Sequence, residues 1–168
     1  VPIRLGQEFR AYSEAIRRDI ARLEHAQDEM RCLNMGGTAV GTGINADEMY
    51  LRRIVPNLSM VTGLQLVQAF NLVDATQNLD GFVAVSGAVK TFAVNLSKMC
   101  NDLRLMSSGP RCGFNEINLP AKQNGSSIMP GKVNPVIPEV VNQVAFNIMG
   151  NDFTITMAAE CGQLELNA

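Results

Sequence analysis

One polar loop of this chain concentrates residue types that can carry out acid–base chemistry. It extends from Gly125 to Glu139 and lies between two segments with helical spacing. It holds two hydroxyls, one ammonium and one carboxamide, contributed by Ser126, Ser127, Lys132 and Asn134. A serine can act as a base or nucleophile, a lysine can neutralise a carboxylate, and an asparagine can donate a hydrogen bond to an oxyanion. The loop is therefore the first candidate for a substrate site.

Prolines and glycines determine the flexibility of the same loop. Three prolines stiffen one end and two glycines allow bending, which suits a lid or a substrate clamp. The loop has no histidine or aspartate to complete a triad, and Lys132 follows Ser127 by five residues rather than the three of a β-lactamase-type motif. On chemistry alone, a structural loop built from common turn residues is the alternative interpretation.

Apolar residues at helical spacing predict three long helices that position this loop. The first covers residues 5–33, and the second covers residues 78–108, where two apolar series repeat every seven residues. The third begins near Pro138, with Glu139 complementing its N-terminus, and we expect it to continue to Ala168. Their long apolar stripes predict packing against further helices or partner subunits.

The remaining segments predict short elements and turns. Residues 47–77 predict short helices, the first of them interrupted at Pro56. The glycine-rich stretch 36–43 has no lysine after its glycines and no βαβ context, so it does not predict a nucleotide site. We expect a tight connection there. Because no segment shows strand-like alternation, the expected fold class is all-α, a bundle of long helices.

Composition narrows the class of protein. The chain has 168 residues, 46% hydrophobic and 18% charged, which excludes a disordered tail, and its net charge of −2 does not favour nucleic acid or anionic lipid. No apolar run approaches the length of a membrane-spanning helix, and the first residues do not show the charged-then-apolar pattern expected of a secretory leader. Four widely spaced cysteines and a single histidine predict neither a metal site nor a disulfide framework. We therefore expect a cytoplasmic protein without membrane or nucleic-acid partners.

The loop also carries a family resemblance. The string from Gly125 to Pro135 has all eight fixed positions of the pattern G-S-S-x-M-P-x-K-x-N-P, and so resembles the signature of the fumarase/aspartase superfamily. Residues 3–9, 37–43, 101–104 and 108–111 also look like segments of that superfamily. The resemblance covers essentially the whole chain and implies the central helical domain of the superfamily.

Two further segments indicate a branch of the superfamily. Residues 115–120 and 135–144 look most like aspartases, and the Thr-Gln-Cys-Glu segment typical of fumarases after the signature proline is missing. The resemblance implies deamination of L-aspartate to fumarate and ammonia, with no redox cofactor. A class II fumarase, or a non-enzymatic helical assembly module, remains the alternative, because the fold does not guarantee activity.

The resemblance also implies a role for each polar residue of the loop. Ser126, as an alkoxide, would be the base that removes a Cβ proton, and the resulting aci-carboxylate requires electrostatic stabilisation. Ser127 would bind the substrate, Lys132 would offset carboxylate charge, and Asn134 would donate a hydrogen bond. We expect support for the site from two further residues, Met129 and Glu139. Glu139 matches the acidic residue that holds a histidine in the family.

The histidine partner of Glu139 is not evident. His25 lies on the first predicted helix and matches no family motif, so we expect it to be an ordinary helix residue. Family motifs that precede this region, and a smaller C-terminal domain, are also missing from residues 1–168. The family forms homotetramers whose active sites combine three subunits. We therefore expect one partial domain over 1–168, which would be inactive alone.

Overall fold

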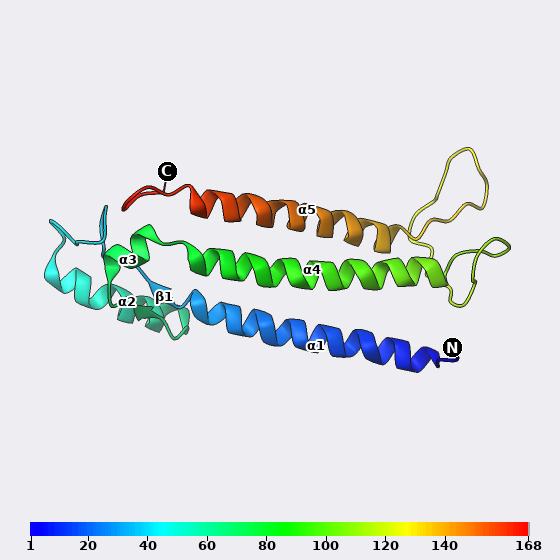
Figure 1. Cartoon of the computed structure of the whole chain (residues 1–168), viewed down its shortest axis with the longest axis horizontal. Helices are drawn as coiled ribbons and strands as arrows, with labels where there is room; N and C mark the ends of the chain where they lie inside the picture. The colour runs from blue at the N-terminus through cyan, green and yellow to red at the C-terminus, as the bar shows by residue number, and fades with distance from the viewer. Residues whose placement is uncertain (168) are drawn as a thin grey trace. The chain divides into compact units, whose positions relative to one another are not determined.

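The computed structural model describes residues 1–167, and Ala168 lies outside the described residues. Its helices are α1 (Leu5–Glu29), α2 (Glu48–Thr62), α3 (Leu72–Gln77), α4 (Asp80–Met106) and α5 (Val136–Glu160) (Figure 1). Two short strands, β1 (Cys32–Leu33) and β2 (Val67–Gln68), form a parallel pair. The all-α fold class is confirmed, with this small strand pair as an addition.

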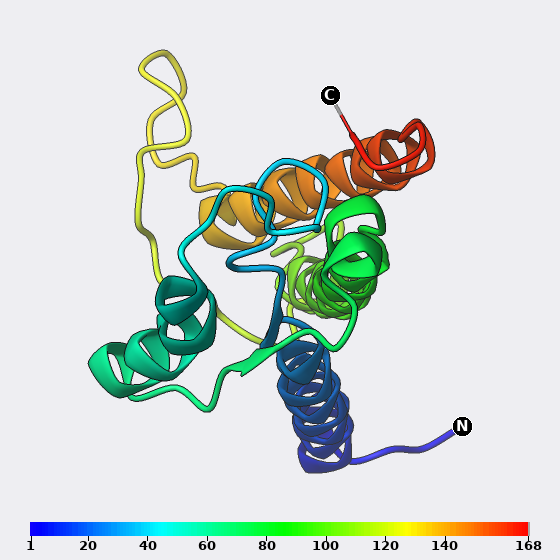
Figure 2. The ribbon, with the colours of Figure 1, turned by 90° about the vertical axis from the view of Figure 1, so that its left-hand side faces the viewer.

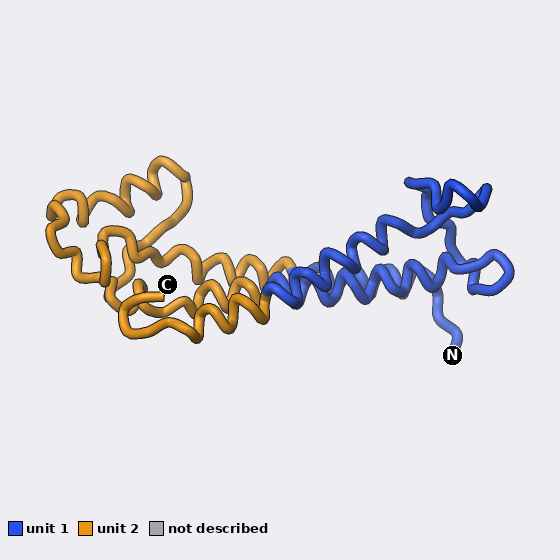
Figure 3. The backbone as a smooth tube through the Cα atoms, turned by 90° about the horizontal axis from the view of Figure 1, so that it is seen from above, with its two compact units in different colours: residues 1–19, 89–151 blue, residues 20–88, 152–168 orange. Residues whose placement is uncertain are grey.

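The chain divides into two compact units (Figure 3). Unit 1 combines Val1–Asp19 with Val89–Asn151, and unit 2 combines Ile20–Ala88 with Asp152–Ala168. Unit 1 therefore contains the first part of α1, most of α4, most of α5 and the whole polar loop. Unit 2 contains the short elements between α1 and α4.

Polar pairs connect the helices of unit 1. Asp19 on α1 is 1% exposed, and the Asn95 amide on α4 donates to both of its carboxylate oxygens at 3.0 and 2.8 Å. A buried carboxylate requires such partners because desolvation of a charge is costly. Two small residues, Ala93 of α4 and Ala145 of α5, are each 2% exposed and form part of the apolar core.

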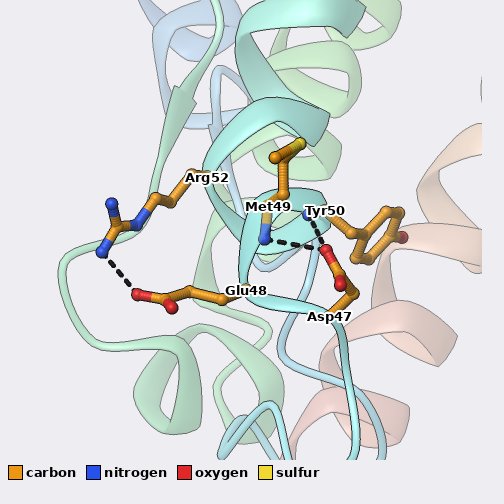
Figure 4. A network of polar contacts seen from close by, with 5 residues as sticks. All are labelled: Asp47, Glu48, Met49, Tyr50 and Arg52. Carbon is orange, nitrogen blue, oxygen red and sulfur yellow. Dashed lines mark hydrogen bonds and ion pairs between the residues drawn. The ribbon is translucent and has the colours of Figure 1, made fainter.

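In unit 2, local hydrogen bonds fix the start of α2. The Asp47 carboxylate accepts from the backbone N–H groups of Met49 and Tyr50 at 2.9 and 3.1 Å (Figure 4). This is the N-cap arrangement, which satisfies donors that the first helical turn leaves unpaired. Glu48 and Arg52 add an ion pair one turn apart on the exposed surface.

The predicted interruption at Pro56 is wrong. Helix α2 continues through Pro56 and ends at Thr62, followed by Gly63 in the left-handed conformation. Proline removes one helical hydrogen bond, but the adjacent Val55 is only 2% exposed. The cap at Asp47 and the burial of Val55 stabilise the helix before the proline, and after it the Gly63 N–H donates to the Ser59 carbonyl at the helix end. Packing and capping therefore override the local preference.

Two predicted helix ends also differ. Helix α1 ends at Glu29 rather than Leu33, because residues 32–33 pair with β2 instead. Helix α5 ends at Glu160, and the Asn167 side-chain amide donates to the Ala158 carbonyl at 2.8 Å. That bond satisfies a carbonyl at the helix end. The predicted continuation through residues 161–167 is therefore wrong, and its last residue, Ala168, lies outside the described residues.

The glycine-rich stretch 36–43 forms turns in the connection between β1 and α2, as predicted (Figure 2).

No helix within residues 1–167 combines the length and apolar character needed to cross a bilayer. Helix α5 nevertheless exposes large apolar side chains along most of its length. These are Ile137, Val140, Val144, Phe146, Phe153, Ile155 and Met157.

Candidate active site

The polar residues predicted from sequence lie on one loop of unit 1, which we call the signature loop and define as Gly125–Pro135. It directly precedes α5. The Gly125 N–H donates to the Lys132 carbonyl at 2.9 Å, and Asn124 forms an antiparallel bridge with Val133. Backbone contacts therefore close the base of the loop like a short hairpin.

The backbone of the signature loop explains both of its glycines. A Cβ atom on Gly125 would lie 2.7 Å from the Lys132 carbonyl oxygen, which is closer than real Cβ contacts allow. Gly131 has a φ of +75°, in the left-handed region that other residues rarely adopt. Both glycines of the signature loop are thus required by backbone geometry.

Ser126 has the most informative environment in the loop. Its side chain is half-buried, and its Oγ accepts hydrogen bonds from the backbone N–H groups of Ile128 and Met129 at 3.1 and 3.2 Å. Two N–H donors directed at one oxygen favour the negatively charged form of that oxygen. The geometry therefore supplies part of the stabilisation that a serine alkoxide needs.

The other predicted residues of the loop are more accessible. Ser127 and Lys132 are exposed, and Asn134 is half-buried with its carbonyl accepting from the Val136 N–H at 2.8 Å. The structure thus gathers the hydroxyls, the ammonium and the carboxamide on one short hairpin next to the N-terminus of α5. Such a loop can present a base and positive charge to a carboxylate substrate.

The two residues expected to support the site have different surroundings. Met129 is 51% exposed, and its backbone N–H, rather than its thioether, contacts Ser126. Glu139 lies in the first turn of α5, where its carboxylate is 3.9 Å from the Arg104 guanidinium of α4. His25 is exposed on α1, as expected.

Two contacts of the predicted site residues were not evident from the sequence. The backbone donors of Ile128 and Met129 carry no side-chain signal, because any residue other than proline supplies an N–H. Arg104 lies in the segment 101–104, which resembles the family. The spacing of residues in the sequence did not predict that its side chain lies beside Glu139.

No cluster of metal-binding type forms among residues 1–167, where no three His, Cys, Asp or Glu side chains gather closely enough to hold an ion. A cavity of about 320 Å³ in unit 1 lies apart from the signature loop. Its lining includes Arg4, Glu8, Tyr12, Asp102 and Glu116. The signature loop stays the candidate site because its Ser126 hydroxyl, a side-chain oxygen that can take up a proton, accepts from two backbone N–H groups.

Comparison with known proteins shows the family to which the chain is related. The sequence model of a family described as lyase matches residues 1–150. Aspartate ammonia-lyase from Bacillus subtilis (strain 168) is 58% identical over 167 residues, which cover 99% of this chain and 35% of that protein. The chain thus spans about a third of the length of this relative.

Solved structures extend the likeness to the fold. Fumarate lyase:delta crystallin from Brucella melitensis, bound to cobalt, matches with a TM-score of 0.93 and 56% identity, covering 100% of this chain and 36% of that one. Recombinant class II fumarase from Schistosoma mansoni matches with a TM-score of 0.87 and 38% identity, covering 99% and 38% of the two chains. The chain therefore belongs to the lyase family of the fumarase/aspartase superfamily.

Proposed function

We propose that the complete protein containing this chain is an ammonia-lyase that converts L-aspartate to fumarate and ammonia, with Ser126 as the base. The observation that carries the proposal is the pair of backbone N–H groups on the Ser126 Oγ. The choice of aspartate is supported by relatives that carry the name aspartate ammonia-lyase at 54–60% identity.

The proposed reaction begins with removal of a proton from the substrate Cβ, which lies next to a carboxylate. The Cβ–H bond breaks, the proton passes to the Ser126 alkoxide, and the electron pair moves into the carboxylate to form an aci-carboxylate. That species carries additional negative charge, so nearby donors and cations lower the barrier. Lys132 and Asn134 are placed on the same loop to supply them.

The second step completes the elimination. The electron pair returns to form the Cα–Cβ double bond, and the Cα–N bond breaks with its electrons moving to nitrogen. The protonated amine leaves as ammonia, and Ser126 retains the proton taken from Cβ until it is released. In this proposal Ser127 binds the substrate, and Glu139 supports the site from the first turn of α5.

Assembly is part of the same proposal. Because α5 exposes large apolar side chains along most of its length, we propose that copies of the complete protein associate through these helices into a homotetramer with shared active sites. The 168 residues would then form one partial domain, inactive without the remainder. The four free thiols favour a reducing compartment such as the cytoplasm.

The test follows fumarate by its ultraviolet absorbance in the purified complete protein, with L-aspartate or L-malate as substrate. Turnover of aspartate without turnover of malate supports the proposal. Turnover of malate alone would assign the fumarase reaction instead, and no turnover of either would favour an assembly module.

A matched pair of variants tests the base. Ser126→Ala should lose nearly all turnover while the oligomer, measured by light scattering, stays intact. Ser13→Ala on the exposed surface of α1 should retain normal turnover. Near-normal turnover in Ser126→Ala would remove Ser126 from the role of base.

A further inference from the structure

The family-like segment Asn101–Arg104 connects α4 to the helix that follows the signature loop. The Asn142 side-chain amide of α5 donates to the Asn101 side-chain oxygen at 2.6 Å. Three residues further along α4, the Arg104 guanidinium lies 3.9 Å from the Glu139 carboxylate. Residues three apart share one helix face, so these contacts are two successive rungs between antiparallel segments of α4 and α5.

The two rungs act on the first turns of α5, which are bonded to the signature loop. The Glu139 N–H donates to the carbonyl of Pro135, the last loop residue, at 3.2 Å. The Val136 N–H donates to the Asn134 carbonyl at 2.8 Å. A continuous path therefore leads from the Arg104 guanidinium through Glu139 and the first turn of α5 to Asn134.

The two rungs differ in burial, and this difference suggests a separate role for each. Asn142 is 5% exposed, whereas the Arg104 and Glu139 side chains are 42% and 35% exposed. Partly exposed ion pairs contribute little to stability, whereas the Asn101–Asn142 bond pairs the buried amide of Asn142 with an exposed asparagine on α4. This bond can therefore hold the helices together when Arg104 is replaced. Loss of Arg104 then releases the Glu139 side chain and the loop end without unfolding unit 1.

We propose that Arg104 is a positioning residue for the reaction at the signature loop: its guanidinium holds Glu139 and the first turn of α5, and thereby fixes Asn134 relative to Ser126. The proposal rests on the proposed function for its chemistry. Arg104 touches no reacting atom. Its effect falls on the donor that stabilises the transition state, so it acts on kcat more than on KM.

The test compares three variants of the complete protein: Arg104→Gln, Arg104→Lys and the control Arg17→Gln. Arg17 pairs with Glu14 at the same 3.9 Å distance, but within one turn of α1. Displacement of a catalytic group by about 1 Å can lower turnover by about 100-fold. We therefore expect Arg104→Gln to lower kcat by about 10- to 100-fold with KM within about threefold of normal.

Lysine keeps the charge at position 104, so Arg104→Lys should be clearly more active than Arg104→Gln. Arg17→Gln should match the unmodified protein. Hydrogen–deuterium exchange at residues 125–135, measured without substrate, gives a readout independent of activity. We expect faster exchange of these amides in Arg104→Gln than in Arg17→Gln.

Several results would overturn the proposal. These are normal kcat in Arg104→Gln, equal activity of the lysine and glutamine variants, or a fall in kcat with unchanged exchange of the loop. Failure of the proposed function is distinguishable, because it appears in the unmodified protein as absence of aspartate turnover. If that protein turns over malate instead, the same comparison is made with malate.

Discussion

The Tyr12 hydroxyl on α1 donates a hydrogen bond at 3.0 Å to the Asp102 carboxylate on α4, which also pairs with Lys98. Tyr12 is 8% exposed. Burial, together with the contact to Asp102, raises the pKa of the Tyr12 phenol well above its usual range. The pair therefore links the packing of α1 on α4 to proton binding.

This link predicts a loss of stability in alkali. Above the usual phenol pKa of about 10, the unfolded chain releases the Tyr12 proton while the folded chain retains it, so the free energy of unfolding falls as pH rises. Below that pH the Tyr12–Asp102 bond makes its full contribution to the free energy of unfolding. Tyr12→Phe should lose about 1 kcal/mol at neutral pH from the missing bond, and its difference from the unmodified protein should shrink above about pH 10. Urea unfolding across this range measures it, and a constant difference would contradict the prediction.

The Asn101–Asn142 bond predicts that a double variant is more stable than one of its single variants. The Asn142 Oδ1 is buried and has no hydrogen-bond partner among the described residues, so its amide depends on Asn101. Asn101→Ala should cost about 1–3 kcal/mol, because it leaves a buried amide unpaired. Adding Asn142→Leu removes that amide and should recover part of the loss. Thermal unfolding of the single and double variants tests this, and a double variant less stable than Asn101→Ala would refute it.

In helix α2, we predict that replacement of Pro56 stabilises the protein. Pro56 is exposed inside the helix and lacks the N–H that would bond to the preceding turn. Pro56→Ala should raise the stability of this segment by about 2 kcal/mol after allowing for the more flexible unfolded chain. Asn57→Ala, at the next exposed position, is the control and should change stability by less than about 0.5 kcal/mol. Local exchange rates in α2 measure both, and slower exchange only in the control would count against the prediction.

The burial of Cys100 predicts that its thiol is protected from alkylation. It is 8% exposed, and burial raises its pKa, with a smaller opposing effect from the Arg104 guanidinium. Because the thiolate is the reactive form, iodoacetamide at neutral pH should label Cys100 only after the protein is unfolded. Mass spectrometry of peptides labelled with and without denaturant identifies the site. Rapid labelling of Cys100 in the folded protein would show that the α4 surface around it opens.

Local sequence patterns predicted most of the helical framework. The heptad series predicted a helix over 78–108, and α4 covers Asp80–Met106, because a periodic apolar stripe is a local property. The loop residues Ser126, Ser127, Lys132 and Asn134 could be grouped in advance since they are adjacent in sequence. Their catalytic roles stay predictions.

What the patterns missed depends on contacts between distant segments. The two-residue strands exist only because residues 32–33 meet residues 67–68, and Pro56 is tolerated beside the buried Val55. The pairing of Arg104 with Glu139 depends on the register of two helices, which apolar spacing restricts but does not specify.

Three of the hydrogen bonds between helices of unit 1 also imply an order of folding. The Asn101–Asn142 bond closes a separation of 41 residues, whereas Asp19–Asn95 and Tyr12–Asp102 close 76 and 90. Closing a shorter loop costs less chain entropy, and contacts that are nearer in sequence form faster. We therefore expect α4 and α5 to join first and α1 to dock last. The signature loop lies between α4 and α5 in the sequence, so both of its ends are anchored by paired helices before α1 docks.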